Sequence, residues 1–322
     1  MPRRKPLMSD IDLEVAITRA EALSDITKRN YKDRVRALVQ KANGKPILEI
    51  VMHPAIYGPL IKQWYTQSTS QKASFTAILA LFRYNPEFKT KHMTLYDQWS
   101  TLFKATDQQV TDRYETNAPS QRQTNGYVPY EELLRVRDTL PEGDIQRLLL
   151  GVYTHIKPLR AEYARIALYV DALPDDLVEP NYIFIKKNKT AQLVIRKFKT
   201  LKHHEAFDIP MPEPLMKDMM LSLKSRPREW LFTNTNGEPY SQSLFSQWTG
   251  KVFKSLFGKP LTIQLIRHSF INTLDFNTLT IVEKKALATE MGHTVQTQDQ
   301  YRLIFKDSKQ ECSCECKSKS AT

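Results

Sequence analysis

The sequence predicts a mainly α-helical protein with a small antiparallel sheet, organised as an all-α N-terminal domain and an α+β C-terminal domain. Three observations lead to this prediction. Apolar residues recur at helical spacing from residue 9 to about residue 115. A polar stretch at 116–129, interrupted by Pro119, Gly126 and Pro129, is typical of a linker. Alternating apolar residues, the pattern of a strand, are concentrated at 182–209, inside a second region that spans 130–306.

The composition favours an acidic partner. The chain has 322 residues, enough for two domains, and its 47 Lys and Arg against 35 Asp and Glu give a net charge of +12. Such an excess indicates nucleic acid or an anionic membrane. No stretch approaches the about 18 apolar residues of a membrane span, and no apolar run follows the basic N-terminus MPRRKPLMSD. Neither a spanning helix nor a signal peptide is therefore expected, and nucleic acid is the preferred partner.

The cysteines indicate a reducing, intracellular compartment. Cys312, Cys314 and Cys316 are the three in the chain, and they lie near its end, which excludes a framework of core disulfides. Their alternate spacing could bind a soft metal, but no second cluster completes such a site, and we expect no cofactor. The tail at 307–322 is predicted to be disordered. The basic leader at 1–8 is also predicted to be disordered. It is interpreted as a nuclear localisation signal, as an arm that contacts phosphates or as a solvated terminus.

The helix predicted after Thr27 has one apolar face and one basic face. Tyr31, Val35 and Leu38 recur at i, i+4 and i+7, and Gly44 ends the pattern. The remaining surface carries the basic residues Lys28, Arg29, Lys32, Arg34 and Arg36. These side chains either contact phosphates or form an ordinary solvated surface. Further helices are predicted from Ser70 to Asn85 and around Trp99.

Arg160 is predicted to stand at a helix start. The helical pattern runs from Tyr130 to Tyr169, with a buried segment at 148–150, and Arg160 follows Pro158 and Leu159. A half-buried arginine cannot lose its proton, so it requires an anion or hydrogen-bonding partners. The residue alone is compatible with a structural salt bridge to Glu162 or with an anion site.

The β region is strongly basic. Strands are predicted at 182–185, 193–195 and 206–209, with a turn at 186–189. Between Asn181 and Lys202 the chain has seven Lys or Arg and no Asp or Glu, a composition suited to phosphates. Alternatively, the lysines protect an edge strand against aggregation. The candidate phosphate contacts are Lys186, Lys187, Arg196, Lys197 and Lys202. Helices at 215–223 and 243–256 and a short strand at 230–232 are interpreted as core.

The stretch 261–301 concentrates polar side chains where a buried helical segment would be apolar. A helical pattern contains Arg267 and His268, a second runs from Thr280 to Glu290, and Met291-Gly292-His293 interrupts it. A polar run then leads to Tyr301. This layout predicts a site assembled from two helix ends.

These residues carry a family resemblance. The Arg-His-Ser-Phe box at 267–270, the Met-Gly-His box at 291–293 and the tyrosine eight residues later resemble the C-terminal signature of the tyrosine recombinases, the phage-integrase family. The resemblance implies a helical core-binding domain at 9–115 and a catalytic domain at 130–306. It also implies an active site made of Arg160, Lys199 in the pair Lys199-Thr200, Arg267, His293 and the nucleophile Tyr301, with Lys202 as the alternative lysine.

Two positions depart from the family pattern. Many members carry a histidine three residues before the second arginine, where this chain has Gln264. The acidic residue after Arg160, Glu162, is at the second position instead of the third. Gln264 can hydrogen-bond a phosphate but cannot act as a base. Deprotonation of Tyr301 is therefore left to water, to His293 or to a phosphate oxygen.

The implied chemistry is phosphoryl transfer to tyrosine. A phenol has an ordinary pKa of about 10, so it needs a proton acceptor and an activated phosphodiester. Two guanidinium groups, of Arg160 and Arg267, can clamp the non-bridging oxygens. The resemblance assigns protonation of the leaving 5′-hydroxyl to Lys199 and a phosphate contact or proton transfer to His293. His268 points away from Arg267 on its helix and is interpreted as packing.

The resulting hypothesis is a site-specific recombinase or integrase. It would cut and rejoin double-stranded DNA at a specific recombination site through a 3′-phosphotyrosyl intermediate, without metal or ATP, as a homotetramer. The resemblance extends to integrases of eukaryotic viruses and mobile elements, which implies a host nucleus or viral factory. The alternatives are a type IB topoisomerase or telomere resolvase, and a catalytically inactive DNA-binding relative. Residues 303–305 are expected to dock on the chain's own core or on a neighbouring subunit.

Overall fold

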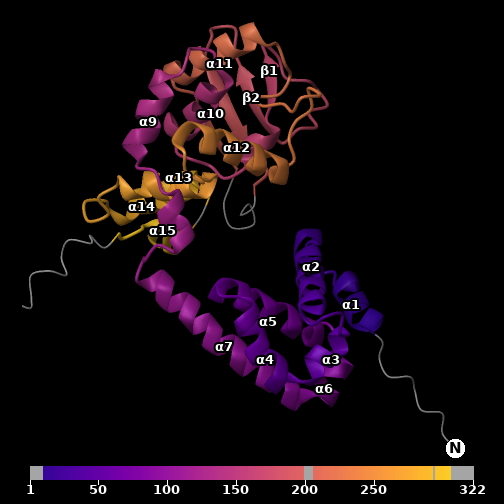
Figure 1. Ribbon diagram of the computed structural model, residues 1–322. Coiled ribbons are helices and arrows are strands. Elements are labelled where there is room, and N and C mark those ends of the chain that lie inside the picture. The colour runs from indigo at the N-terminus through magenta and orange to yellow at the C-terminus, as the bar shows by residue number, and fades with distance from the viewer. Residues whose placement is uncertain (1–9, 199–205, 293, 306–322) are drawn as a thin grey trace, which may run out of the picture. The chain divides into compact units, whose positions relative to one another are not determined.

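The computed structural model describes residues 10–198, 206–292 and 294–305 (Figure 1). The chain forms two compact units, Met1–Thr116 and Asn117–Thr322. Each has its own hydrophobic core. Among the described helices, none combines the length and the apolar character needed to cross a lipid bilayer.

The first unit is all α-helical. Its helices are α1 (Asp10–Arg19), α2 (Asp25–Lys41), α3 (Ile47–Met52), α4 (Pro54–Trp64), α5 (Ser68–Arg83), α6 (Pro86–Lys91) and α7 (Met93–Glu115). Helix α5 is the central element, because it packs on α2 and α7 and buries Phe75, Ile78 and Phe82. In α7 the buried Trp99 donates its indole N–H to the carbonyl of Val51 at 2.9 Å. The helical prediction for this part is confirmed.

Helix α2 begins before the predicted cap. Ser24, not Thr27, is the N-cap, and its hydroxyl accepts a hydrogen bond from the backbone N–H of Thr27. Thr27 therefore lies in the first turn. The apolar face is as predicted, since Val35 and Leu38 are fully buried.

The stretch predicted as a linker contains a helix. Within 116–129, α8 (Gln121–Gly126) starts with a capping box between Ser120 and Gln123. A Cβ at Gly126 would come within 2.7 Å of both the Leu265 side chain and the Pro260 carbonyl oxygen, so α8 packs closely on the rest of the second unit. Val128 is buried in that unit's core. The polar composition of the stretch did not indicate this packing.

The second unit surrounds a small sheet with helices. Its helices are α9 (Tyr130–Thr139), α10 (Ile145–Thr154), the 3-10 helix η1 (Glu162–Arg165), α11 (Glu213–Ser225), α12 (Gln242–Phe257), α13 (Ile263–Asn272), α14 (Ile281–Glu290) and α15 (Val295–Tyr301). Its strands are β1 (Ala167–Val170), β2 (Asn181–Ile185), β3 (Ala191–Ile195) and β4 (Phe207–Pro210). Figure 1 shows α13, α14 and α15 gathered in one region, away from the sheet.

The sheet is mixed, so the antiparallel prediction was incomplete. The strand order is β1-β2-β3-β4; β2, β3 and β4 pair antiparallel, whereas β1 pairs parallel to β2. Residues 167–169 were predicted to be helical. They form a strand because β2 pairs with them on one side and residues 229–231 bond them on the other, through Leu168 N–H to the Glu229 carbonyl and a bridge to Trp230.

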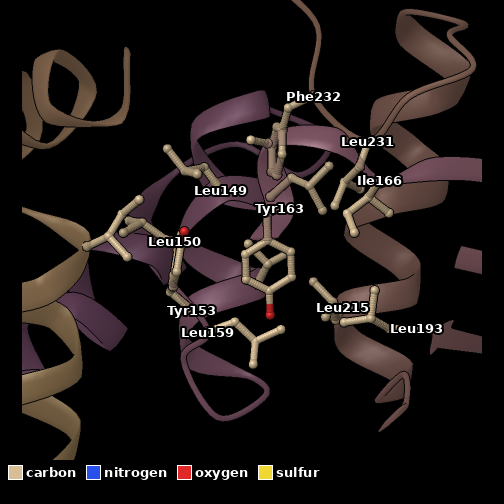
Figure 2. Packing of buried hydrophobic residues seen from close by; sticks show 14 of the residues in the cluster. Leu149, Leu150, Tyr153, Leu159, Tyr163, Ile166, Leu193, Leu215, Leu231 and Phe232 are labelled. Atoms are coloured by element: carbon tan, nitrogen blue, oxygen red, sulfur yellow. The ribbon is translucent and has the colours of Figure 1, made fainter. Parts of the chain in front are cut away.

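The core of the second unit lies around two tyrosines (Figure 2). Tyr153 of α10 and Tyr163 of η1 meet edge to face, with their ring centroids 5.2 Å apart. Leucines of α10, β3 and α11 surround them. The Tyr153 hydroxyl donates to the carbonyl of Arg160 at 2.9 Å. The core therefore holds the backbone of a candidate site residue.

A buried ion pair connects α10 to α11. The Arg147 Nε donates to both carboxylate oxygens of Asp218, at 2.8 and 3.0 Å, and Arg147 also bonds the Leu140 carbonyl. We expect Asp218→Ala to lower the free energy of unfolding by about 3 kcal/mol, because it leaves a buried guanidinium without its counterion. Urea unfolding followed by tryptophan fluorescence measures this change.

The matched control lies one residue earlier on α11. Lys217 pairs with Glu142 at 2.6 Å, but both side chains are more than half exposed. Lys217→Ala should cost less than about 1 kcal/mol, because solvent screens an exposed pair. Equal losses for the two variants would contradict the structural role of the Arg147–Asp218 pair.

Candidate active site

Three helices bring the C-terminal motif together. Helix α13 begins at the N-cap Thr262, whose hydroxyl accepts from the Leu265 N–H, and α14 begins with a capping box between Thr280 and Glu283. Ile271, Leu287, Met291 and Tyr301 then pack in one small core. Tyr301 is the last residue of α15, so the polar run that was predicted to lead to it is itself helical.

Arg267 is fully buried and joins three segments of the chain. Its Nε donates to the Tyr301 hydroxyl at 3.2 Å, and the guanidinium carbon lies 4.9 Å from the centre of that ring. Its Nη2 donates to the carbonyl of Met291 at 2.9 Å, and its Nη1 donates to that of Pro158. Burial lowers the pKa of Arg267, and the neighbouring charge of Arg160 acts in the same direction. The ordinary pKa of a guanidinium lies so far above neutral pH that Arg267 stays charged in spite of this decrease.

Arg160 lies beside the same loop. Its Nη1 donates to the carbonyl of Gly292 at 2.6 Å. Gly292 has a φ of +63°, the left-handed region, and a Cβ there would lie 3.7 Å from Arg160 Nη1 and 3.6 Å from the Phe198 ring. Glycine is therefore the residue that this turn requires. Lys157 forms an ion pair with Glu290, which ties the Arg160 segment to the end of α14.

Arg160 does not use Glu162 as a partner. Among the described residues no ion pair joins them, which excludes the structural salt bridge as the reason for this arginine. Glu162 is buried, and its Oε2 has no hydrogen-bond partner among the described residues. Arg160 itself stands in a bend before η1 and not at the start of an α-helix.

A pocket of about 710 Å³ opens next to these arginines. Its wall includes Arg160, Gln264 and, from α8, Arg122 and Gln123, together with Ser243, Ser246 and Gln247 of α12. The lining carries two arginines and several amide and hydroxyl side chains but no carboxylate, beside the apolar Ala161, Ile263 and Leu265. It is suited to an anionic ligand. Among the described residues, no group of three His, Cys, Asp or Glu side chains is arranged to hold a metal ion.

The Tyr301 hydroxyl is in a cationic environment. Burial raises the pKa of this phenol, but the charges of Arg267 and Arg160 and the hydrogen bond from Arg267 outweigh burial, so its pKa lies below the usual 10.0. The hydroxyl donates to Gln264 Oε1 at 3.2 Å. Gln264 therefore contacts the tyrosine itself, a role that the sequence did not predict. The arrangement makes the phenolate, the nucleophilic form, easier to reach than in an ordinary tyrosine.

His268 supports the site without facing the pocket. Its Nδ1 lies 2.5 Å from the carbonyl oxygen of Tyr301, which can only accept, so Nδ1 carries the proton. Its Nε2 then accepts from Gln123 Nε2 at 3.4 Å. Burial lowers the pKa of His268, which keeps the ring neutral. The prediction that His268 packs instead of reacting agrees with these contacts.

The buried His268 and the half-buried His155 predict acid sensitivity. Burial lowers the pKa of His268 and of His155 below the usual 6.5. The unfolded chain therefore binds protons more readily, so stability is full above about pH 6.5 and falls as pH decreases through the lowered pKa values. We expect the melting temperature to fall between about pH 7.5 and about pH 5.5, and to fall less in His155→Gln. An equal decrease in this variant would contradict a contribution from His155.

The remaining predicted residues fall into two groups. Lys199, Lys202 and His293 lie outside the described residues, as do the three cysteines. The others are on the surface: Lys28, Arg29, Lys32 and Arg36 on α2, and Lys186, Lys187, Arg196 and Lys197 around the β2–β3 hairpin. Arg196 forms an ion pair with Asp208 of β4, so the hairpin is less purely basic than its own sequence indicates.

The extra strand also introduces a third candidate lysine, after Lys199 and Lys202. The family pattern places the lysine in the turn between the second and third strands, which the sequence assigned to Lys199-Thr200. With β1 counted, the turn between β2 and β3 is 186–190, and it ends in Lys189-Thr190. Lys189 is exposed and has a φ of +62°. It was not singled out from the sequence.

No model of a known protein family matches the chain, and no curated protein matches it. Solved structures do match. A dimer of lambda integrase residues 75–356 bound to a COC′ core site is 14% identical with a TM-score of 0.55, over 94% of this chain and 96% of that chain. The Tn1549 transposon integrase in complex with transposon right end DNA is 17% identical with a TM-score of 0.54, over 93% and 96%. A lambda integrase tetramer bound to a Holliday junction is 13% identical with a TM-score of 0.55, over 91% and 76%. The chain thus has the fold of the tyrosine recombinases and integrases.

Proposed function

We propose that the protein is a site-specific tyrosine recombinase that cuts and rejoins double-stranded DNA. The observation that carries this proposal is the buried contact of Arg267 with the Tyr301 hydroxyl, next to Arg160 and a pocket suited to anions. A tyrosine whose pKa is lowered between two arginines has little structural purpose. It is well suited to attack a phosphodiester.

Each residue has a defined part in the proposed step. The Tyr301 oxygen forms a bond to phosphorus, the bond to the 5′ oxygen breaks, and the product is a 3′-phosphotyrosine with a free 5′-hydroxyl. Arg160 and Arg267 stabilise the additional negative charge on the phosphate oxygens. The phenolic proton passes to water, to His293 or to a phosphate oxygen, because Gln264 is not a base. The phosphotyrosyl bond conserves the energy of the phosphodiester, so rejoining needs no ATP.

The leaving 5′ oxygen requires a proton donor. We assign this role to Lys199, with Lys202 and the hairpin residue Lys189 as alternatives. The choice is testable with a duplex that carries a 5′-thiol leaving group, which leaves without protonation. Replacement of the true general acid slows cleavage of the ordinary duplex and not of the thiol duplex. A normal rate for Lys199→Ala on the ordinary duplex, with a slow rate for Lys189→Ala, would transfer the role to Lys189.

DNA binding by the first unit should depend on salt. Arg29 and Arg36 of α2 are exposed, and Lys28 and Lys32 are half-buried beside them. If they contact phosphates, log affinity falls with log salt concentration, and each lost contact reduces the slope by about 0.9. We expect a shallower slope for Lys28→Gln combined with Arg29→Gln, and no change for Lys91→Gln on α6. An unchanged slope in the double variant would exclude α2 as a phosphate-binding surface.

The alternatives differ in what the DNA does after cleavage. The DNA sites for these assays are to be sought among repeats that flank the gene. Strand exchange between two such sites, with a tetramer on the DNA, supports the recombinase. Relaxation of supercoiled plasmid without sequence preference supports a type IB topoisomerase instead. Specific binding without any covalent adduct would indicate an inactive DNA-binding relative, and it would exclude the proposed chemistry. Action on a viral or mobile element, in a host nucleus or viral factory, is part of the same proposal.

A further inference from the structure

One face of α13 contacts the tyrosine segment at three successive levels. Gln264, His268 and Asn272 are four residues apart, so they line the same side of the helix. Gln264 bonds the Tyr301 hydroxyl, His268 bonds the Tyr301 carbonyl, and Asn272 bonds the backbone of Leu303. Neither Asn272 nor these pairings follow from the sequence motifs.

Asn272 holds Leu303 with two hydrogen bonds. Its Nδ2 donates to the Leu303 carbonyl at 3.0 Å, and its Oδ1 accepts from the Leu303 N–H at 2.9 Å. The second hydrogen on Nδ2 points to the Tyr127 hydroxyl, 3.3 Å away. The side-chain amide thus uses both of its donor hydrogens and one acceptor position to bond Leu303 and Tyr127. It satisfies both backbone groups of a buried residue that no strand or helix pairs.

The following residues continue along the same unit. The Ile304 N–H donates to the carbonyl of Asn117 at 3.0 Å, and the ring of Phe305 lies 4.6 Å from that of Tyr127. Residues 303–305 therefore contact the chain's own second unit, one of the two expectations from the sequence, with Leu303 buried and Ile304 and Phe305 exposed. Asn272 is the centre of this docking, because it bonds both Leu303 and Tyr127.

The tyrosine needs such an anchor. Helix α15 has seven residues and Tyr301 is its last, so the helix contributes little rigidity of its own. After Tyr301 the backbone becomes extended at Arg302. Fixing Leu303 two residues beyond the tyrosine, together with the His268 bond to Tyr301, restricts how the phenol can rotate relative to Arg267.

We propose that Asn272 is a positioning residue for Tyr301: its amide clamps the backbone of Leu303 and thereby holds the phenolic oxygen against Arg267 and Gln264. This inference rests on the proposed function for its effect on cleavage, but the clamp can be measured without DNA. Asn272 does not touch the reacting atoms. It acts through the backbone.

The test compares Asn272→Ala and Asn272→Asp with the control Asn277→Ala, which changes an exposed asparagine in the loop after α13. Asn272→Asp keeps the size and one acceptor but loses the donors to Leu303 and Tyr127. The first measurement is amide hydrogen exchange at Leu303 and Ile304. The second is ultraviolet titration of the Tyr301 phenol, obtained by subtracting the spectrum of Tyr301→Phe. Neither requires a DNA substrate.

We expect faster exchange at Leu303 in Asn272→Ala and a smaller increase in Asn272→Asp, whose carboxylate still accepts from the Leu303 N–H but repels the Leu303 carbonyl. In both variants we expect a phenol that titrates at higher pH than in the wild type. Single-turnover cleavage of the DNA site should slow by on the order of 10²-fold in Asn272→Ala, with unchanged DNA affinity. The decrease should be smaller in Asn272→Asp, which retains the Leu303 N–H bond. Asn277→Ala should match the wild type in all measurements.

Two results have distinct meanings. Unchanged exchange at Leu303 together with an unchanged phenol titration in Asn272→Asp would overturn the clamp, even if Asn272→Ala does not fold. Absence of cleavage by the wild type would overturn the proposed function only. The exchange and titration data would still decide whether Asn272 positions the tyrosine.

Discussion

Tyr301→Phe is expected to abolish covalent attachment to DNA while leaving DNA affinity close to that of the wild type. The change removes a single oxygen, which is the proposed nucleophile. The ring that packs on Arg267 and in the core with Ile271 and Met291 stays in place. A nicked duplex that carries the recombination site traps the adduct, because the short strand beyond the cleavage point diffuses away. Denaturing gel electrophoresis then measures the trapped fraction.

The matched control is Tyr169→Phe, a tyrosine on β1 away from the three helices of the site. It should form adduct at the wild-type rate. Adduct formation by Tyr301→Phe at a comparable rate would show that another group attacks the DNA, and it would remove the basis for the mechanism.

Arg267→Ala is expected to have two separable effects. Loss of a preorganised donor to the phosphate should slow cleavage by on the order of 10²- to 10³-fold. The carbonyls of Pro158 and Met291 would also lose their donor, which costs about 1–3 kcal/mol of stability for each buried group left without a partner. Single-turnover kinetics at saturating protein measures the first effect, and urea unfolding measures the second.

Arg267→Lys separates charge from geometry. Lysine keeps the positive charge but cannot bond Tyr301, Met291 and Pro158 together, so we expect cleavage to stay far below the wild-type rate. Arg165→Ala is the control, because Arg165 is an exposed arginine that pairs with Glu179 near the sheet, away from Tyr301. Wild-type cleavage by Arg267→Lys would mean that charge alone suffices and that the observed hydrogen bonds contribute nothing to catalysis.

The principal site residues could be predicted because each lies in a compact motif. Arg267, the Met291-Gly292 turn and Tyr301 are separated by fewer than about forty residues, and α13, α14 and α15 each begin with a side-chain cap that is visible in the sequence. Gln264 could be recognised as unusual at its position. Its contact with the Tyr301 hydroxyl could not, because that depends on how α15 packs against α13.

Features that depend on distant pairing were missed. Residues 167–169 of β1 read as helix, and only β2 and residues 229–231 make them a strand. Helix α8 has the composition of a linker, and its role is visible only where Gly126 meets Leu265. The role of Asn272 was missed for the same reason, since its partners Leu303 and Tyr127 are far away in the sequence. Local patterns therefore indicated which polar side chains come together in the candidate site better than they indicated the residues that hold those side chains in position.

The most direct test of the central claim is to identify the atoms that link the protein to DNA. Wild-type protein trapped on the nicked duplex is digested with protease and nuclease, and the nucleotide-bearing peptide is sequenced by mass spectrometry. We predict a 3′-phosphate esterified to the Tyr301 oxygen, with a free 5′-hydroxyl on the released strand. Attachment through another residue or through a 5′-phosphate, or no adduct on a duplex that the protein binds specifically, would contradict this account.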